Sequence, residues 1–174
     1  STSDYTKLQE LTDGLLARTV EKKINLSLPS LRVDNFSMEL MEKVQKVKKS
    51  GLTFAPEAGT QRLSDVINKN VLESDLLRTS KIAFGGGYNR MKLYFMLGLP
   101  TETQEDVYGI GDLAQKVIDV FYEIPKEERK GRSVSVTVST SFFVPKPFTP
   151  FQWEPQAKIE EMEEKARSLK KYIT

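Results

Sequence analysis

Strand-like and helix-like segments alternate along the whole of this 174-residue chain, and this alternation is what most restricts its fold. Strand patterns lie near residues 24–28, 52–55, 91–97 and 134–138, and helical spacing of apolar residues separates each from the next. Such alternation is typical of βα units whose parallel strands form one sheet. Four strands are too few to close a barrel of the usual size. We therefore expect an α/β fold whose parallel sheet is an open arc, part of a TIM-type barrel.

The same periodicity predicts a single domain that occupies residues 1–174. Residues 1–22 are expected to contain an amphipathic helix that precedes the first strand. Residues 24–150 are expected to hold four βα units, and 155–173 a C-terminal helix with charged outer positions. No internal repeat, low-complexity tract or linker divides the sequence.

Several local signals fix where elements begin and end. Thr60 and Thr103 are natural N-caps, and Asp106 lies in the positive first turn of the helix that Thr103 begins. The glycines at 85–87 follow a helix and lack the GxxxxGK[ST] pattern, so a helix end and turn explains them better than a phosphate loop. Pro56 should end the strand that begins at residue 52. The basic stretch 126–132 is expected to be a solvated loop.

Composition excludes several classes of function. The chain has no Cys and no His, so it cannot form a disulfide, a usual zinc site or a Ser-His-Asp or Cys-His site. Its net charge of +2 gives no strong nucleic-acid signal, and its longest apolar run, 93–100, is too short to span a bilayer. We expect a soluble, cytoplasmic protein. The first residues lack the features of a signal peptide and read like a cut inside a longer chain.

Functional residues of parallel α/β folds gather where the strands end, because the loops there converge on one face. These loops start at Pro29, Pro56, Gly98 and Phe143, and each carries Pro, Gly or a charged group directly after its strand. The Ser/Thr side of the strand at 133–141 could contact a polar ligand, or its small residues could serve packing alone.

Each candidate residue also has a purely structural interpretation. Glu57 precedes a helix N-terminus, where a carboxylate is favourable without any function. Arg32 and Lys69 are the kind of charged residue that is usually solvated. Tyr94 and Phe95 lie in an apolar strand, which favours a place in the core over a place in a site.

Three of these segments resemble a known family. Gly51–Leu63, followed by Ile67–Lys69, resembles the fourth strand and helix of radical S-adenosylmethionine (radical SAM) enzymes. Lys92–Thr103 looks like their fifth strand and its Gly-Leu-Pro-x-Glu-Thr turn. Phe143–Phe151 is similar to the sixth-strand signature of cobalamin-domain-linked and methylthiotransferase-like members. The order and spacing imply the third to sixth βα units of the family's (βα)6 core barrel.

The resemblance implies a fragment of an Fe-S oxidoreductase. In the family, a CxxxCxxC loop upstream of these units holds a 4Fe-4S cluster, which cleaves S-adenosylmethionine reductively to a 5′-deoxyadenosyl radical. This chain has no Cys, so it contains neither the cluster ligands nor any other metal ligand or catalytic residue that the family's pattern would assign. Its expected contribution is part of the barrel that binds S-adenosylmethionine and substrate, and the fragment alone should be inactive.

Position by position, the resemblance gives roles to the residues after the strands. Glu57 would bind the ribose hydroxyls, and Lys69 would lie against the methionine carboxylate. Ser30 and Arg32 would approach the methionine or the substrate. Tyr94 stands where relatives often carry Asp, so it departs from their second ribose contact.

The adenine would be flanked by an apolar slot with main-chain hydrogen bonds, formed by Leu97, Gly98, Val144 and Pro145. Lys146 and Arg132 are weaker candidates for contact with the substrate, whose identity the sequence does not indicate.

The expected partners are the N-terminal part of the barrel and, through the bare edge of the strand at 24–28, a second copy of the chain. A competing interpretation is a non-catalytic α/β module that docks a protein through the loops and the helix at 155–172. A TIM-type enzyme that binds phosphate at its last loops ranks third, because no Gly-rich loop lies near residue 144.

Overall fold

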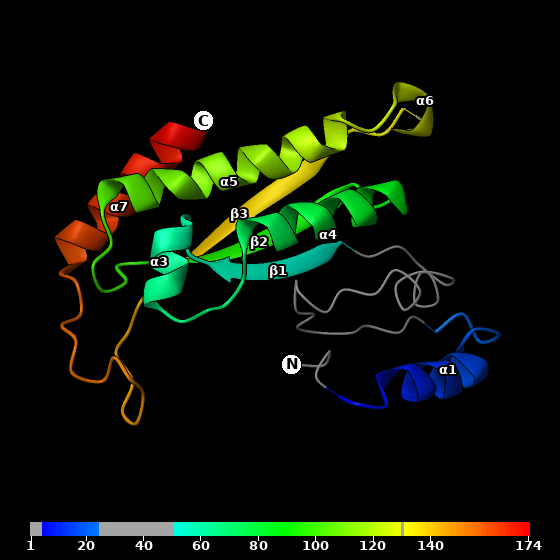
Figure 1. Ribbon diagram of the computed structural model, residues 1–174, viewed down its shortest axis with the longest axis horizontal. Helices are drawn as coiled ribbons and strands as arrows, with labels where there is room; N and C mark the ends of the chain where they lie inside the picture. The colour runs from blue at the N-terminus through cyan, green and yellow to red at the C-terminus, as the bar shows by residue number, and fades with distance from the viewer. Residues whose placement is uncertain (1–4, 25–50, 130) are drawn as a thin grey trace.

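The computed structural model describes residues 5–24, 51–129 and 131–174. Within them, three parallel strands form one open sheet in the order β1-β2-β3 (Figure 1). The strands are β1 (Leu52–Glu57), β2 (Arg90–Leu97) and β3 (Ser135–Phe142). This confirms the expected α/β fold with a parallel sheet. The strand expected near residues 24–28 lies almost wholly outside the described residues.

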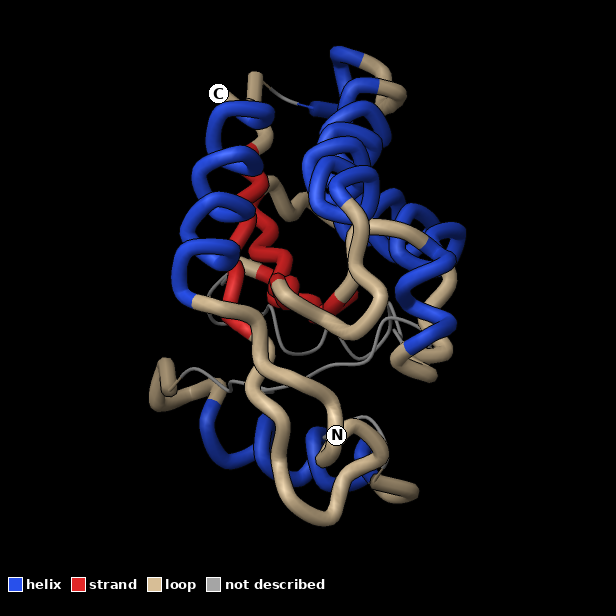
Figure 2. The backbone as a smooth tube through the Cα atoms, turned by 90° about the vertical axis from the view of Figure 1, so that its left-hand side faces the viewer, coloured by secondary structure: helices blue, strands red, loops and turns tan. Residues whose placement is uncertain are grey.

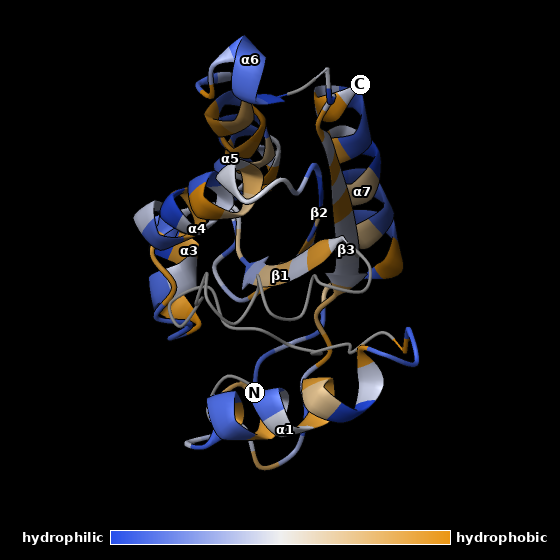
Figure 3. Cartoon of the chain, turned by 90° about the vertical axis from the view of Figure 1, so that its right-hand side faces the viewer, coloured by the Kyte–Doolittle hydropathy of each residue, from blue (hydrophilic) through white to orange (hydrophobic). Residues whose placement is uncertain are grey.

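The described helices are α1 (Leu8–Thr19), α3 (Gln61–Val66), α4 (Glu73–Gly85), α5 (Gln104–Tyr122), α6 (Lys126–Arg129) and α7 (Ile159–Ile173). Of these, α4, α5 and α7 pack over one face of the sheet, whereas α1 precedes β1 and lies apart from them (Figure 1). The helices α4 and α5 pack against each other, and α7 lies beside α5 on the side away from α4 (Figure 2). The hydrophilic residues of α7 face outward (Figure 3), as the expected C-terminal helix requires.

The main core lies between the sheet and these helices. Residues of β2 alternate between the two faces, so that Met91, Leu93 and Phe95 are buried against the helices. Phe95 is therefore a core residue, as expected. Tyr94 is not, because it points to the opposite face and is 39% exposed. The expectation that Tyr94 lies in the core was therefore wrong, because the residues of β2 alternate between a buried face and a more exposed one.

The capping signals are confirmed. The Thr60 hydroxyl accepts a hydrogen bond from the backbone N–H of Leu63, 3.3 Å away, at the start of α3. Thr103 and Asp106 form a reciprocal capping box at the start of α5. The turn after α4 contains Gly87 with φ of 96°, a left-handed conformation that favours glycine. The glycine run is thus the end of a helix, as expected.

Several boundaries differ from those expected. Pro56 does not end β1, because the pairing with β2 shifts by one residue between Phe54 and Glu57. An irregularity of this kind tolerates a residue without an N–H donor. The basic stretch 126–132 contains the short helix α6, and α7 begins at Ile159 although helix was expected from residue 155. Among the described helices, none combines the length and apolar character needed to cross a bilayer.

Candidate functional site

The carboxyl ends of the three strands lie next to one another at one edge of the sheet, called here the carboxyl edge. Leu97 at the end of β2 is in register with Phe142 of β3, and Glu57 at the end of β1 pairs with Phe95 of β2. The N–H of Phe143 donates to the carbonyl of Leu97 over 2.8 Å. Three of the four loops predicted to converge therefore do so. The fourth, with Ser30 and Arg32, lies outside the described residues.

A small apolar cluster holds the loops of this edge together. It contains Ala58 after β1, Leu99 after β2 and Phe143 after β3, together with Leu63 of α3. The ring of Phe151 packs on Phe143 edge to face, with centroids 6.1 Å apart. Because this cluster draws on all three loops, the main chain at the carboxyl edge is fixed in position by packing separate from the main core.

Glu57 and Lys69 form an ion pair at this edge, with Oε1 and Nζ 3.2 Å apart. Their side chains are 27% and 33% exposed, so solvent reaches both charged groups. Glu57 has φ of 70°, which costs a residue with a Cβ about 1 kcal/mol or more. The pairing shift in β1 and this left-handed backbone together give the Glu57 side chain a direction that a regular strand would not give it.

The turn after α3 brings Lys69 back to Glu57. Asn68 and Asn70, on either side of it, both have left-handed backbone, with φ of 51° and 52°. Asn tolerates this conformation better than most residues, so the local sequence suits the turn. The N–H of Lys69 donates to the carbonyl of Ser64 over 3.0 Å. The resemblance placed Glu57 and Lys69 in one site, and the fold brings them into contact.

The turn after β2 is built on a buried carboxylate. Gly98, with φ of 79°, and Leu99 both donate their backbone N–H to Oε2 of Glu102. The other oxygen of Glu102 lies 3.3 Å from Nζ of Lys165 on α7. Only 1% of the Glu102 side chain is exposed, so its charge is balanced by these donors rather than by water. The C-terminal helix thus fixes the main chain at Gly98.

The remaining predicted residues are spread over different surroundings. The Leu97 side chain is fully buried in the main core, so only its main chain can face a ligand at this edge. Val144 is exposed and Pro145 is half-buried beside it. Lys146 is exposed in the loop after β3. Arg132 precedes β3 at the opposite end of the sheet, where its guanidinium donates to the carbonyls of Arg129 and Glu128.

Asp106 has a structural role beyond its place in the first turn of a helix. Burial by itself raises the pKa of this carboxyl, but hydrogen bonds from Arg62, Thr60 and Thr103 outweigh that effect and lower the pKa to about 2. Arg62 also donates to the carbonyl of Thr101 over 2.9 Å. Asp106 therefore ties the loop after β1 to the loop after β2. Its position in a helix first turn was visible in the sequence, whereas its partners in other elements were not.

Two glycines let α5 approach the loop after β1 at backbone distance. A Cβ on Gly59 would collide with the backbone of Asp106 and Ile110. A Cβ on Gly109 would lie 2.7 Å from Cγ2 of Thr60. Neither glycine has left-handed backbone, so space rather than conformation requires them. The close approach makes the carboxyl edge stiff where Glu57 lies.

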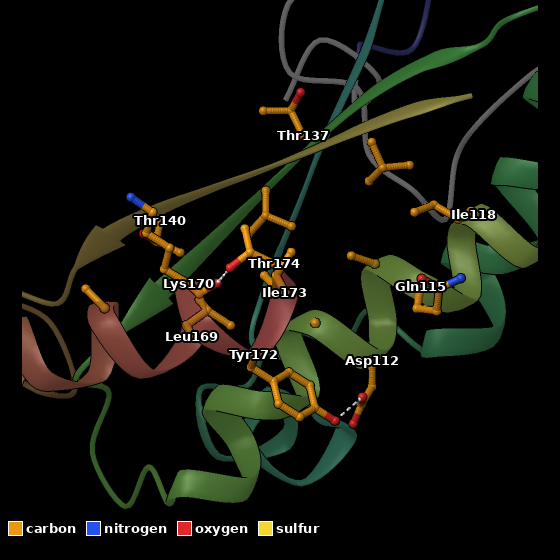
Figure 4. A pocket seen from close by; sticks show the side chains of 15 residues that line it. Asp112, Gln115, Ile118, Thr137, Thr140, Leu169, Lys170, Tyr172, Ile173 and Thr174 are labelled. Atoms are coloured by element: carbon orange, nitrogen blue, oxygen red, sulfur yellow. Dashed lines mark hydrogen bonds between the residues drawn. The ribbon is translucent and has the colours of Figure 1, made fainter. Parts of the chain in front are cut away.

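A groove of about 790 Å³ lies elsewhere, between α5, β3 and α7 (Figure 4). Its wall includes Ile118, Leu169 and Ile173, and the Tyr172 hydroxyl donates to Asp112 over 2.8 Å. That hydrogen bond raises the pKa of Tyr172, because a phenolate would face the carboxylate. Thr137 and Thr140, from the Ser/Thr-rich strand that the sequence offered as a possible polar contact, line this groove, whereas none of the described residues given roles by the family resemblance does.

Within residues 5–24, 51–129 and 131–174, no three His, Cys, Asp or Glu side chains come together in a way that could hold a metal ion. Among the described residues, a ligand of the carboxyl edge would instead meet the Glu57 carboxylate, the Lys69 ammonium group and main-chain atoms.

The comparisons with known proteins leave the family open. No model of a known protein family matches the chain. An uncharacterized protein of Methanocaldococcus jannaschii is similar, with 34% identity over 173 residues. The match covers 99% of this chain and 33% of the relative, so the chain spans about a third of that protein's length.

Proposed function

We propose that the chain is the C-terminal part of the core barrel of a radical SAM Fe-S oxidoreductase, comprising its third to sixth βα units. The proposal rests above all on the Glu57–Lys69 pair beside the Gly98 turn at the carboxyl edge. These are three positions that the family resemblance singled out; Glu57 and Lys69 are 12 positions apart, on either side of α3, and Gly98 follows the next strand. The open parallel sheet suits a partial TIM-type barrel.

The chemistry of the pair suits S-adenosylmethionine. Glu57 offers a carboxylate that can accept two hydrogen bonds from vicinal ribose hydroxyls, and Lys69 offers a cation for the methionine carboxylate. Both are partly exposed and already held in place, so little side-chain entropy is lost on binding. The Gly98 N–H is occupied by Glu102, so adenine contacts would come from carbonyl groups there and from the main chain at Val144 and Pro145.

The chain would supply binding and orientation, because it has no Cys to hold the 4Fe-4S cluster. When bound in the remainder of the barrel, that cluster supplies the electron that cleaves a C–S bond of S-adenosylmethionine. A relative three times as long as the matched region leaves room for such a remainder. The isolated chain should therefore be inactive, and calorimetry should detect weak binding of S-adenosylmethionine or none.

The test uses the full-length parent protein, reconstituted anaerobically with iron and sulfide. Release of 5′-deoxyadenosine under reducing conditions is the expected result. Glu57→Gln should weaken S-adenosylmethionine binding about tenfold or more, because it removes charge-assisted hydrogen bonds. The control Glu127→Gln, an exposed carboxylate of α6 at the opposite end of the sheet, should leave binding unchanged. A parent that forms no cluster, or in which Glu57→Gln binds normally, would contradict the proposal.

A second candidate, a non-catalytic module that docks a protein, is favoured by the loop after β3. Phe148 is 98% exposed and Trp153 is 88% exposed, and large aromatic side chains of this kind are frequent anchors of protein interfaces. The coding sequence upstream of Ser1 separates the two candidates. A CxxxCxxC about one and a half βα units earlier supports the enzyme, whereas an immediate start codon supports the docking module.

A further inference from the structure

A row of three polar residues crosses the open face of the sheet near the amino ends of the strands. Lys92 of the central strand is in register with Thr53 of β1 on one side and Thr137 of β3 on the other. Their neighbours in the sequence, Leu52 and Met91, are buried against the helices, so the row faces away from the helices. Lys92 therefore has a threonine beside it on each neighbouring strand, on the same face of the sheet.

A second cation lies beside this row on the same face. Arg90 precedes Lys92 by two residues, which places the two side chains roughly 7 Å apart along β2. Ser135 of β3 is in register with Arg90. Together these residues line a hollow of about 240 Å³, at the end of the sheet opposite Glu57. Five residues separate Lys92 from Leu97, or roughly 16 Å along the strand.

The two cations have no counter-charge in the part of the chain that the structure describes. No carboxylate lines the hollow, and neither Arg90 nor Lys92 forms an ion pair with any described residue. Among the described residues, the side chain of Lys92 interacts with the ring of Tyr94, whose centre lies 5.6 Å from Nζ. By contrast, Lys81 and Lys116 on the helical surface each pair with a glutamate. Two like charges side by side repel each other, and an anion between them would remove that repulsion.

We propose that this hollow binds a phosphate-type oxyanion, either free phosphate or the phosphate group of a small phosphomonoester. Arg90 offers a planar fork suited to two phosphate oxygens, and Lys92 a third charged donor. The hydroxyls of Thr53, Ser135 and Thr137 rotate freely and can donate to the remaining oxygens. This site differs from the carboxyl edge in place and chemistry, so it does not depend on the function proposed above.

The test is a titration of the 15N-labelled chain with sodium phosphate, with sodium chloride at matched ionic strength as reference. Saturable shifts are expected for the amides of the hollow and for the ring signals of Tyr94, with a dissociation constant in roughly the millimolar range. Glycerol phosphate tests a phosphomonoester in the same way. Tighter binding of glycerol phosphate identifies a phosphorylated metabolite as the ligand, and tighter binding of phosphate identifies the free ion.

The variant R90Q/K92Q should weaken phosphate binding at least tenfold. The control K81Q/K116Q removes the same amount of charge from the helical surface and should bind as the unaltered chain does. Because Arg90 and Lys92 are both exposed, their replacement should leave the unfolding temperature nearly unchanged, which confirms that the fold is intact. Arg90→Lys keeps the charge and should lose part of the affinity.

Two results would overturn the proposal. One is the absence of saturable shifts in the hollow at any phosphate concentration beyond the effect of ionic strength. The other is an equal loss of response in R90Q/K92Q and K81Q/K116Q, which would show general attraction of anions to a basic surface.

Discussion

Two of the contacts that helix α5 makes with the rest of the protein differ in burial and in bonding. Its first turns meet the loop after β1 at backbone distance through Gly59 and Gly109, with the buried carboxylate of Asp106 beside them. It also meets α7 through side chains that water reaches: the half-buried Tyr108 stacks on the exposed Tyr172 at 4.5 Å, and Tyr172 donates to Asp112. The first contact is buried and bonded on several sides, and the second is open to water.

This difference indicates which of the two contacts contributes more to the stability of the fold. Buried charged groups with several hydrogen-bond partners permit one arrangement only, because any displacement leaves a charge without a partner. Exposed pairs contribute little and exchange easily with water. The rigid contact adjoins Glu57 and the Gly98 turn, which is the support that a ligand site requires. Single substitutions in the two regions can measure how much each contact contributes to stability.

The largest effect is expected for Gly59→Ala. The added methyl group would overlap the backbone of Asp106 and Ile110, so α5 or the loop must move, at about 3 kcal/mol of unfolding free energy. Urea denaturation followed by circular dichroism measures this. The matched control is Gly85→Ala, where nothing lies within 4 Å and the helix should gain about 0.5 kcal/mol. Equal effects of the two substitutions would show that the close approach of α5 is not required.

Asp106→Asn comes next and carries a pH signature. Because folding lowers the pKa of Asp106 from 3.8 to about 2, its contribution is fully present above about pH 4 and is lost as the pH falls towards 2. That shift corresponds to about 2 kcal/mol. Urea denaturation at a series of pH values should therefore show an acid loss of stability in the unaltered chain that is reduced in Asp106→Asn. An identical acid profile in both chains would assign the loss to other carboxylates.

The smallest effect is expected for Tyr172→Phe. The neutral phenol donates to Asp112 and its pKa is raised, so its contribution is present below pH 10 and is lost only as the pH rises through the raised value. At neutral pH the melting temperature should fall by only about 1 °C, because the pair is exposed. Tyr122→Phe, on the exposed side of the same helix α5, is the control. A loss of stability as large as that caused by Asp106→Asn would mean that the two contacts of α5 contribute equally.

Local signals in the sequence were sufficient for the described strands and for every described helix except α6. Thr60 and Thr103 marked helix starts correctly because an N-cap depends on residues three positions away. Periodicity placed β2 and β3 for the same reason. It did not reveal that the described helices leave one face of β2 uncovered, since that depends on how the helices pack on the sheet. Tyr94 was therefore expected in the core and is partly exposed.

The site was predictable only where the residues themselves follow a strand. Glu57 and Gly98 could be named because parallel strands bring their carboxyl ends together. The family resemblance gave Glu57 and Lys69 separate roles in one site, and their contact was not predicted, because it depends on the left-handed backbone of Asn68 and Asn70, which no periodicity indicates. The support that Lys165 gives to Glu102 spans 63 positions and two elements, so neither residue stood out in the sequence.

The register of the sheet also dictates the order in which the chain can acquire its structure. Leu52 pairs with Met91, and Met91 with Val136, so each pairing joins positions roughly 40 residues apart. Neither can form as a hairpin, and each must wait until an intervening helical crossover has been made. During synthesis β1 and β2 can meet while β3 is still inside the ribosome. The segment with β3 and α7, which emerges after β1 and β2, then completes both the described sheet and, through Lys165, the turn at Gly98.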